Sequence, residues 1–143
     1  MADAATITLP VGHAVSFEKT ISDADVCAFA QVSGDTNPLH LDEAQATRTR
    51  FGKRVAHGIL TAGVISAALG TKLAPPGTYI VYVGQTLQFR RPVFIGDTVR
   101  AECTVSAFDS EKNIATLAVV CTNQQGDAVL RGEAQVLLER LAT

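Results

Sequence analysis

The chain has 143 residues, of which 47% are hydrophobic, and a formal net charge of −2. This length and apolar content suit one domain, residues 1–143, built on a single core. The 12 Lys and Arg residues are scattered apart from two adjacent pairs, Lys53–Arg54 and Arg90–Arg91, so the chain offers no basic field for a nucleic-acid backbone.

Two further features bear on where the protein works. Residues 1–6 lack the basic and apolar regions of a signal peptide, and the longest apolar stretch, 59–69, is far below the ~20 residues that span a bilayer. Cys27, Cys103 and Cys121 are far apart with no Cys-x-x-Cys spacing, which predicts small buried hydrophobes and neither a disulfide framework nor a zinc site. We therefore expect a soluble cytoplasmic protein, with no membrane contact and no metal.

The first part of the chain predicts a strand and two helices. Residues 13–21 alternate loosely and indicate a strand. Ser22 is a candidate N-cap, with Asp25 three positions later in the place of a capping box, and the helix that begins there can end at Gly34. Good helix formers in 42–50 predict a short surface helix. We interpret the following Lys53 and Arg54 as a solvated turn.

The segment 57–69 is apolar apart from Thr61 and Ser66, and Pro75, Pro76 and Gly77 end it. A helix that is apolar on nearly every face belongs in the centre of a fold. The rest of the chain predicts consecutive strands, which are 79–89, 98–108, 114–123 and 129–138. Helices first and strands later predict an α+β domain, with a mostly antiparallel β-sheet wrapped around one long central helix.

The loop 33–40 concentrates the polar chemistry of the chain. Asp35, Asn37 and His40 follow an apolar helical segment, and Gly34 and Pro38 give the loop a reason to curl. A curled loop can hold one water between Asp35 and His40, which satisfies two partly buried polar groups. The alternative is that Asp35 and Asn37 only cap turns and that His40 is a satisfied core histidine.

On these residues the chain resembles the MaoC-like (R)-specific enoyl-CoA hydratases, which have the hot-dog fold. The resemblance covers nearly the whole chain, and its strongest element is the loop 33–40 with Leu41 and Asp42. Residues 55–58, 84–85, 89–93 and 95–97 also match. It implies a hydro-lyase that adds water reversibly to trans-2-enoyl-CoA, with the thioester as substrate and no cofactor.

Residue roles follow from the resemblance by position. Asp35 and His40 match the catalytic pair, Asn37 the residue that orients the water and the loop, and Gly58 the glycine whose N–H faces the thioester oxygen. A packing glycine is the alternative for Gly58. The remaining pocket candidates are Ser66, His57, Gly84 and Gln85, although His57 is also expected to make a structural hydrogen bond at the start of its helix, and Ser66 can equally be a buried serine bonded to its own helix.

The resemblance leaves partners and substrate to be tested. Arg90 and Arg91, with Lys53 and Arg54, are candidates for the CoA phosphates, although charged loops are more often solvated. The resemblance also implies a homodimer joined at its sheet edges, with the acyl tunnel near the subunit boundary. We expect a short-chain substrate in polyhydroxyalkanoate or fatty-acid metabolism. An acyl-CoA thioesterase, a 3-hydroxyacyl-carrier-protein dehydratase and a non-catalytic acyl-binding module stay open as alternatives.

Overall fold

The structure, a computed structural model, describes residues 6–143. The prediction that residues 1–6 lack the features of a signal peptide therefore falls largely outside the described residues. Within 6–143 no helix has the length and apolar character needed to cross a membrane. In chain order the elements are β1 (Ala14–Thr20), α1 (Asp23–Ser33), α2 (Pro38–Leu41), α3 (Glu43–Thr47), α4 (Gly58–Lys72), β2 (Thr78–Phe89), β3 (Thr98–Asp109), β4 (Ile114–Thr122) and β5 (Ala128–Arg140).

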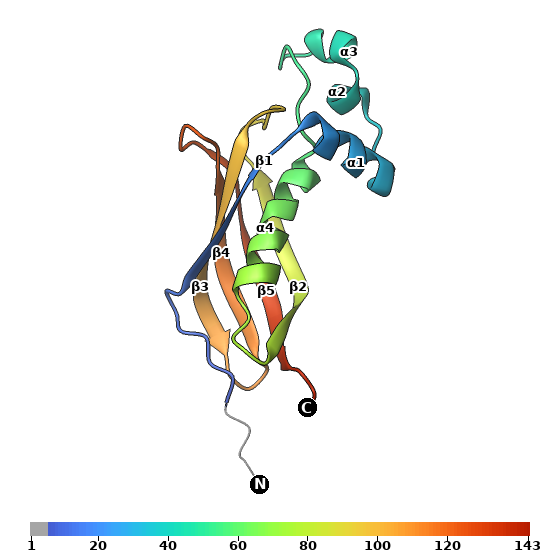
Figure 1. Ribbon diagram of the computed structural model, residues 1–143. Coiled ribbons are helices and arrows are strands. Elements are labelled where there is room, and N and C mark those ends of the chain that lie inside the picture. The colour runs from blue at the N-terminus through green and yellow to red at the C-terminus, as the bar shows by residue number, and fades with distance from the viewer. Residues whose placement is uncertain (1–5) are drawn as a thin grey trace.

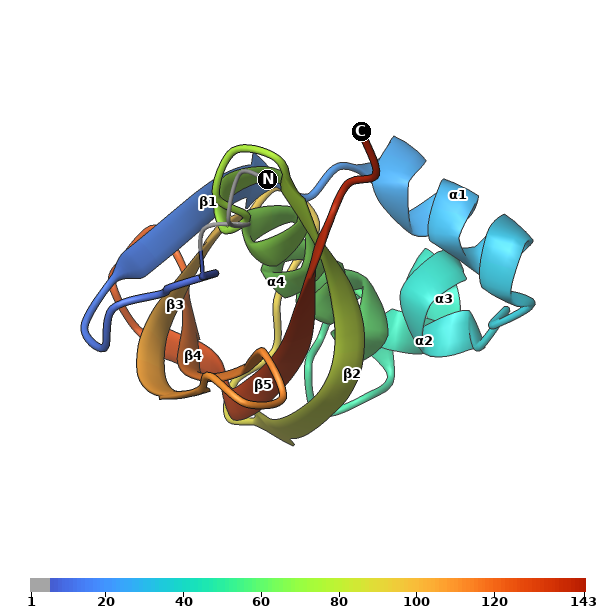
Figure 2. The same cartoon turned by 90° about the horizontal axis from the view of Figure 1, so that it is seen from below.

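The five strands form one sheet in the order β1-β3-β4-β5-β2, and every neighbouring pair is antiparallel. The sheet curls around α4, which lies along its concave side (Figures 1 and 2). The short helices α1, α2 and α3 stand together beyond one end of the sheet (Figure 1). The predicted α+β architecture, with an antiparallel sheet wrapped on one long helix, is confirmed.

The core lies between α4 and the concave face of the sheet. Alternate residues of β3 and β4 are buried, as expected of strands with one face on a core. Cys103 and Cys121 belong to this set, and burial raises the pKa of each thiol to about 12, so both stay protonated at neutral pH. Cys27 is exposed on α1, so the expectation that all three cysteines are buried is wrong for it.

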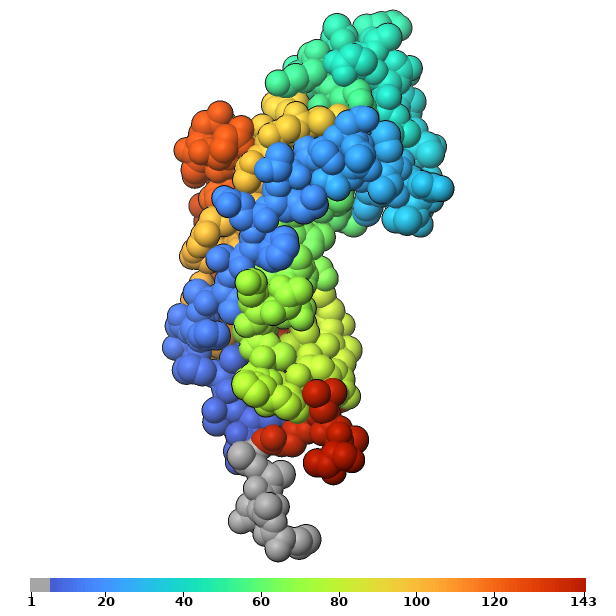
Figure 3. Space-filling view, in the orientation of Figure 1, coloured from blue at the N-terminus to red at the C-terminus, as the bar shows by residue number. Residues whose placement is uncertain are grey.

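Helix α4 is buried on one face only. Its buried residues are Thr61, Val64, Ile65, Ala68 and Leu69. The expectation of burial on nearly every face is wrong in the single chain, because a stripe at helical spacing stays exposed and atoms of α4 reach the surface in Figure 3. The exposed stripe consists of Ile59, Gly63, Ser66 and Gly70.

The ends of α1 follow the predicted local chemistry. The Ser22 hydroxyl accepts the Asp25 N–H at 3.0 Å, and the Asp25 carboxylate accepts the Ser22 N–H at 2.9 Å, which completes the capping box. Gly34 ends the helix in the left-handed conformation, with φ 81°. This turn sets Asp35 at the exit of α1, facing the start of α4.

Candidate active site

The loop after α1 is curled by a series of side-chain caps. Ser33 Oγ accepts the Asp35 N–H at 3.1 Å, Asp35 Oδ1 accepts the Asn37 N–H at 3.2 Å, and Asn37 Oδ1 accepts the Leu39 N–H at 3.0 Å. The last of these bonds begins α2, a four-residue helix that the sequence did not predict. The curl was predicted, and the capping role considered as the alternative for Asp35 and Asn37 is also real.

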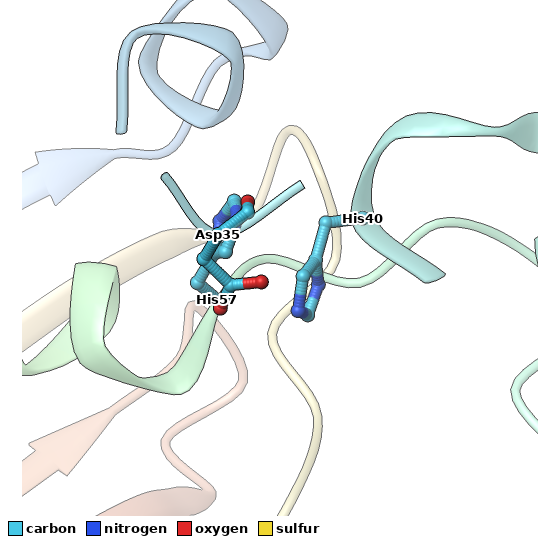
Figure 4. Close-up of side chains that lie close together, drawn as sticks. All are labelled: Asp35, His40 and His57. Atoms are coloured by element: carbon cyan, nitrogen blue, oxygen red, sulfur yellow. The ribbon is translucent and has the colours of Figure 1, made fainter. Parts of the chain in front are cut away.

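The curl brings Asp35, His40 and His57 together. One potential ligand atom from each of these side chains lies within 4.8 Å of those of the other two. Figure 4 shows the Asp35 carboxylate pointing toward the His40 ring. Two hydrogen bonds of about 2.8 Å that meet at one water oxygen span roughly 4.6 Å, so this spacing suits a water held by both groups.

His40 is held in one orientation by the segment before α4. Its Nδ1 lies 2.7 Å from the Val55 carbonyl oxygen, and the side chain is buried. A carbonyl only accepts, so Nδ1 carries the proton, and the neutral ring keeps its lone pair on Nε2. His40 can therefore accept a proton at Nε2, or donate one there once it is charged.

His57 makes the structural hydrogen bond expected of it. Its Nε2 donates to the Asp35 carbonyl oxygen at 3.0 Å, which ties the loop 33–40 to the start of α4. The side chain is 1% exposed, and its ring packs against His40 at 4.0 Å and Phe29 at 4.7 Å between centroids. The His57 ring therefore anchors the backbone of Asp35 and packs beside His40.

The same three side chains could each offer one ligand atom to a metal ion. The His40 and His57 ring centroids lie 4.0 Å apart with the rings tilted by 35°, and the His57 Nδ1 atom is buried without a hydrogen-bond partner. The expectation of no metal stays a prediction.

A cavity of about 390 Å³ adjoins the cluster. His40 and Gly58 lie on its wall, together with Arg90 and Arg91. Ser66, His57, Gly84 and Gln85, the other pocket candidates, are not on its wall in this chain. None of the remaining wall residues was named as a pocket candidate. Some of them lie in segments that carry the family resemblance, namely Leu39, Val55, Ala56, Phe89, Pro92 and Val93. No motif marks the others, which are Arg50, Phe51, Ile59, Thr61 and Val129.

Gly58 shows the close packing considered as its alternative, and its role toward a thioester oxygen stays a prediction. It is the first residue of α4, and no side-chain hydrogen bond caps that end, so its N–H has no helical partner and the helix dipole favours negative charge there. A Cβ at this position would lie 2.6 Å from Phe89 Cε1. Gly58 therefore lets an aromatic ring close on the helix start while its amide is available to a ligand.

Thr61 presents a buried hydroxyl without a protein partner. It is 2% exposed, and its Oγ1 makes no hydrogen bond. The hydroxyls of Ser33, Thr47 and Thr71 instead donate to the carbonyl four residues earlier, at 2.6–2.7 Å. A buried unpaired hydroxyl costs stability.

We expect Thr61→Val to raise the free energy of unfolding of the free protein by about 1 kcal/mol, since a methyl group replaces the unpaired hydroxyl. Thermal unfolding measures the change. Thr71→Val is the matched control. Thr71 is on the same helix, but it is exposed and its hydroxyl donates to the Ala67 carbonyl, so this substitution should not raise the free energy of unfolding. A loss of stability in Thr61→Val would show that the hydroxyl has a partner.

Lys53 and Arg54, which were predicted to form a solvated turn, behave differently from each other. Lys53 is exposed and lies 4.3 Å from the Phe94 ring centroid, as a solvated turn residue can. Arg54 turns inward, with 16% of its side chain exposed, and contacts Asp23 and the His40 backbone. The interpretation of Arg54 as a solvated turn residue is wrong, because these two acceptors lie within its reach once the chain has folded.

Comparisons with known proteins agree with this geometry. The model of the MaoC like domain matches residues 7–126. An (R)-specific enoyl-CoA hydratase of Rhodospirillum rubrum is 48% identical over 127 residues, 89% of this chain and 86% of the relative. A 3-hydroxybutyryl-CoA dehydratase of Methylorubrum extorquens is 51% identical over 129 residues, 90% of this chain and 80% of the relative.

A solved structure extends the likeness to the fold. The (R)-hydratase from A. caviae involved in PHA biosynthesis superposes with a TM-score of 0.84 at 43% identity, covering 91% of this chain and 97% of that one. The predicted hot-dog fold is confirmed by this match. With a family model that spans most of the chain, a relative close to half identical and the same fold, the chain belongs to the MaoC-like domain family.

Proposed function

We propose that this protein hydrates trans-2-enoyl-CoA to (R)-3-hydroxyacyl-CoA, reversibly, as a hydro-lyase. The observation that carries the proposal is the placement of Asp35 and His40 within 4.8 Å of each other, beside a cavity that also meets the uncapped start of α4. The hydratase names of relatives close to half identical support it.

The proposed reaction needs proton transfer and charge stabilisation. Asp35 and His40 hold the water, and one of them removes a proton as the water oxygen attacks C3. Electrons move toward the thioester oxygen, where the Gly58 N–H donates a hydrogen bond to the developing enolate. Delivery of a proton to C2 completes the addition of one water and restores the site. Water is the only co-reactant, so the proposal includes no cofactor.

The wall of the cavity suits a thioester with a charged carrier. Arg50, Arg90 and Arg91 lie on it, and guanidinium groups bind phosphate in two-bond geometry. Phe51 and Phe89 supply apolar surface among these cations. We propose CoA as the carrier and a short acyl chain. A location in the cytoplasm and supply of polyhydroxyalkanoate monomers complete the proposal, the latter by analogy with the A. caviae relative.

Hydration is tested against thioester cleavage in one assay. Purified protein is added to crotonyl-CoA while the ultraviolet absorbance of the enoyl thioester is followed, and a thiol reagent runs in parallel. Loss of absorbance without release of thiol supports hydration, thiol release supports a thioesterase, and binding without turnover supports an acyl-binding module. Cys27 is exposed, so enzyme without substrate sets the thiol background. Crotonyl-acyl carrier protein tests the alternative carrier.

We also propose a homodimer joined at the β2 edge. β2 is the last strand of the sheet and carries exposed Tyr79, Val81, Tyr82 and Val83. An open apolar edge is an aggregation risk that pairing with a second edge removes. The exposed stripe of α4 and the pocket candidates Gly84 and Gln85, which are on β2, would then lie near the subunit boundary.

Val83→Lys should convert the dimer into a monomer, because Val83 is 50% exposed on the β2 edge and a lysine there opposes edge pairing. Sedimentation equilibrium at micromolar concentration measures this. Val11→Lys is the control: Val11 is an exposed valine outside the sheet, and its replacement should leave the dimer intact. A wild-type monomer, or a Val83→Lys dimer, would contradict the proposed interface.

A further inference from the structure

Arg54 joins the loop 33–40 to α1 by two short contacts. Its Nε donates to the His40 carbonyl oxygen at 2.7 Å, and its terminal NH₂ lies 2.7 Å from Asp23 Oδ1. Asp23 is in the first turn of α1, and Arg54 is in the segment that leads to α4. One guanidinium therefore links the start of α1 to α2, the short helix that carries His40.

Arg54 and its neighbour Val55 both contact His40, one of the two residues proposed to transfer protons. Val55, its neighbour, accepts His40 Nδ1–H at 2.7 Å, so residues 54 and 55 hold both the backbone and the ring of His40. The Val55 N–H also donates to the Leu39 carbonyl at 3.4 Å. Helix α2 has four residues and cannot fix this geometry by itself.

We infer that Arg54 is a positioning residue for proton transfer: it satisfies the last turn of α2, holds His40 against Asp35, and is itself held by Asp23. This inference rests on the proposed hydration. It differs from the phosphate-binding role considered for Arg54, because both ends of the guanidinium are engaged by the protein and the residue is not on the cavity wall. A displacement of about 1 Å at a reacting group can cost about 10²-fold in rate, so a loose His40 is enough to impair turnover.

The test compares Arg54→Gln with wild type on two substrates, crotonyl-CoA and a crotonyl thioester of N-acetylcysteamine, which lacks the nucleotide phosphates. We expect kcat to fall about tenfold or more on both substrates, with KM for crotonyl-CoA nearly unchanged. Arg54→Lys should recover only part of the loss, since an ammonium lacks the planar fork that reaches both acceptors.

Lys19→Gln is the matched control. Lys19 pairs with Asp25 at 3.0 Å, in the same turn of α1, without touching the loop 33–40, so its loss should leave kcat unchanged. If Arg54→Gln fails to fold, Asp23→Asn carries the test, because it leaves Arg54 in place and Asp23 is largely exposed. A smaller fall in kcat, again equal on both substrates, is expected for it.

Two results would overturn the inference. A rise in KM confined to crotonyl-CoA would assign Arg54 to phosphate binding, and unchanged kinetics in folded Arg54→Gln would give it no part in turnover. A spectroscopic readout is independent of both: the imidazole nitrogen resonances of His40 should report a single Nδ1–H form in wild type and a mixture in Arg54→Gln. Because wild-type turnover is measured first, failure of the hydratase proposal is seen separately from failure of this inference.

Discussion

Asp35→Asn and His40→Gln are each expected to lower kcat for crotonyl-CoA hydration by about 10²-fold or more, with little change in KM. Neither group contacts the carrier in the proposed mechanism, whereas both handle the attacking water and its protons. Asparagine keeps the shape of Asp35 and can still accept the Asn37 N–H, but it loses basicity. Glutamine at position 40 removes the Nε2 lone pair.

The two substitutions should not be additive. Groups that act on the same water lose their joint effect with the first substitution, so the double variant should be about as slow as the slower single variant. Asp42→Asn is the matched control: Asp42 is an exposed carboxylate that accepts the Gln45 N–H at 3.1 Å, and asparagine caps a helix equally well. Near-normal turnover in the folded double variant would remove Asp35 and His40 from the mechanism.

Gly132→Ala is expected to have the largest effect on stability. Gly132 lies in β5 between β4 and β2, and a Cβ there would fall 1.9 Å from the Thr86 carbonyl oxygen. The clash is with backbone, so β2 must move away from β5, and overpacking of this kind costs about 3 kcal/mol.

At a few degrees per kcal/mol, the melting temperature should fall by roughly 10 °C. Thermal unfolding by circular dichroism measures it, and activity should fall in parallel because β2 carries Phe89 at the start of α4. An unchanged melting temperature would show that β2 and β5 are farther apart in solution than in this structure.

Local chemistry in the sequence was enough to predict several elements. Ser22 and Asp25 define the start of α1 by themselves, and Gly34 defines its end, since each acts within a few residues of its own position. The same holds for the curl of the loop 33–40, where side chains bond backbone groups two positions away. Signals of this kind do not depend on the rest of the fold.

Features set by distant segments could not be predicted. Arg54 reads as a turn residue until His40 and Asp23 are brought beside it, 14 and 31 positions earlier in the chain. The pocket wall includes Phe89 from β2 and Val129 from β5, which are 40 positions apart in the chain. The exposed stripe of α4 depends on which side of the helix the sheet covers. Because the segment is apolar on nearly every side, its sequence does not indicate which face is buried.

The most direct test of the account is the product formed from crotonyl-CoA in isotopically labelled water, resolved by mass and by chirality. We predict that wild type forms (R)-3-hydroxybutyryl-CoA with one labelled oxygen on C3 and an intact thioester, and that the Asp35→Asn, His40→Gln double variant does not. Labelled crotonate with free CoA thiol would contradict it and assign the site to thioester hydrolysis.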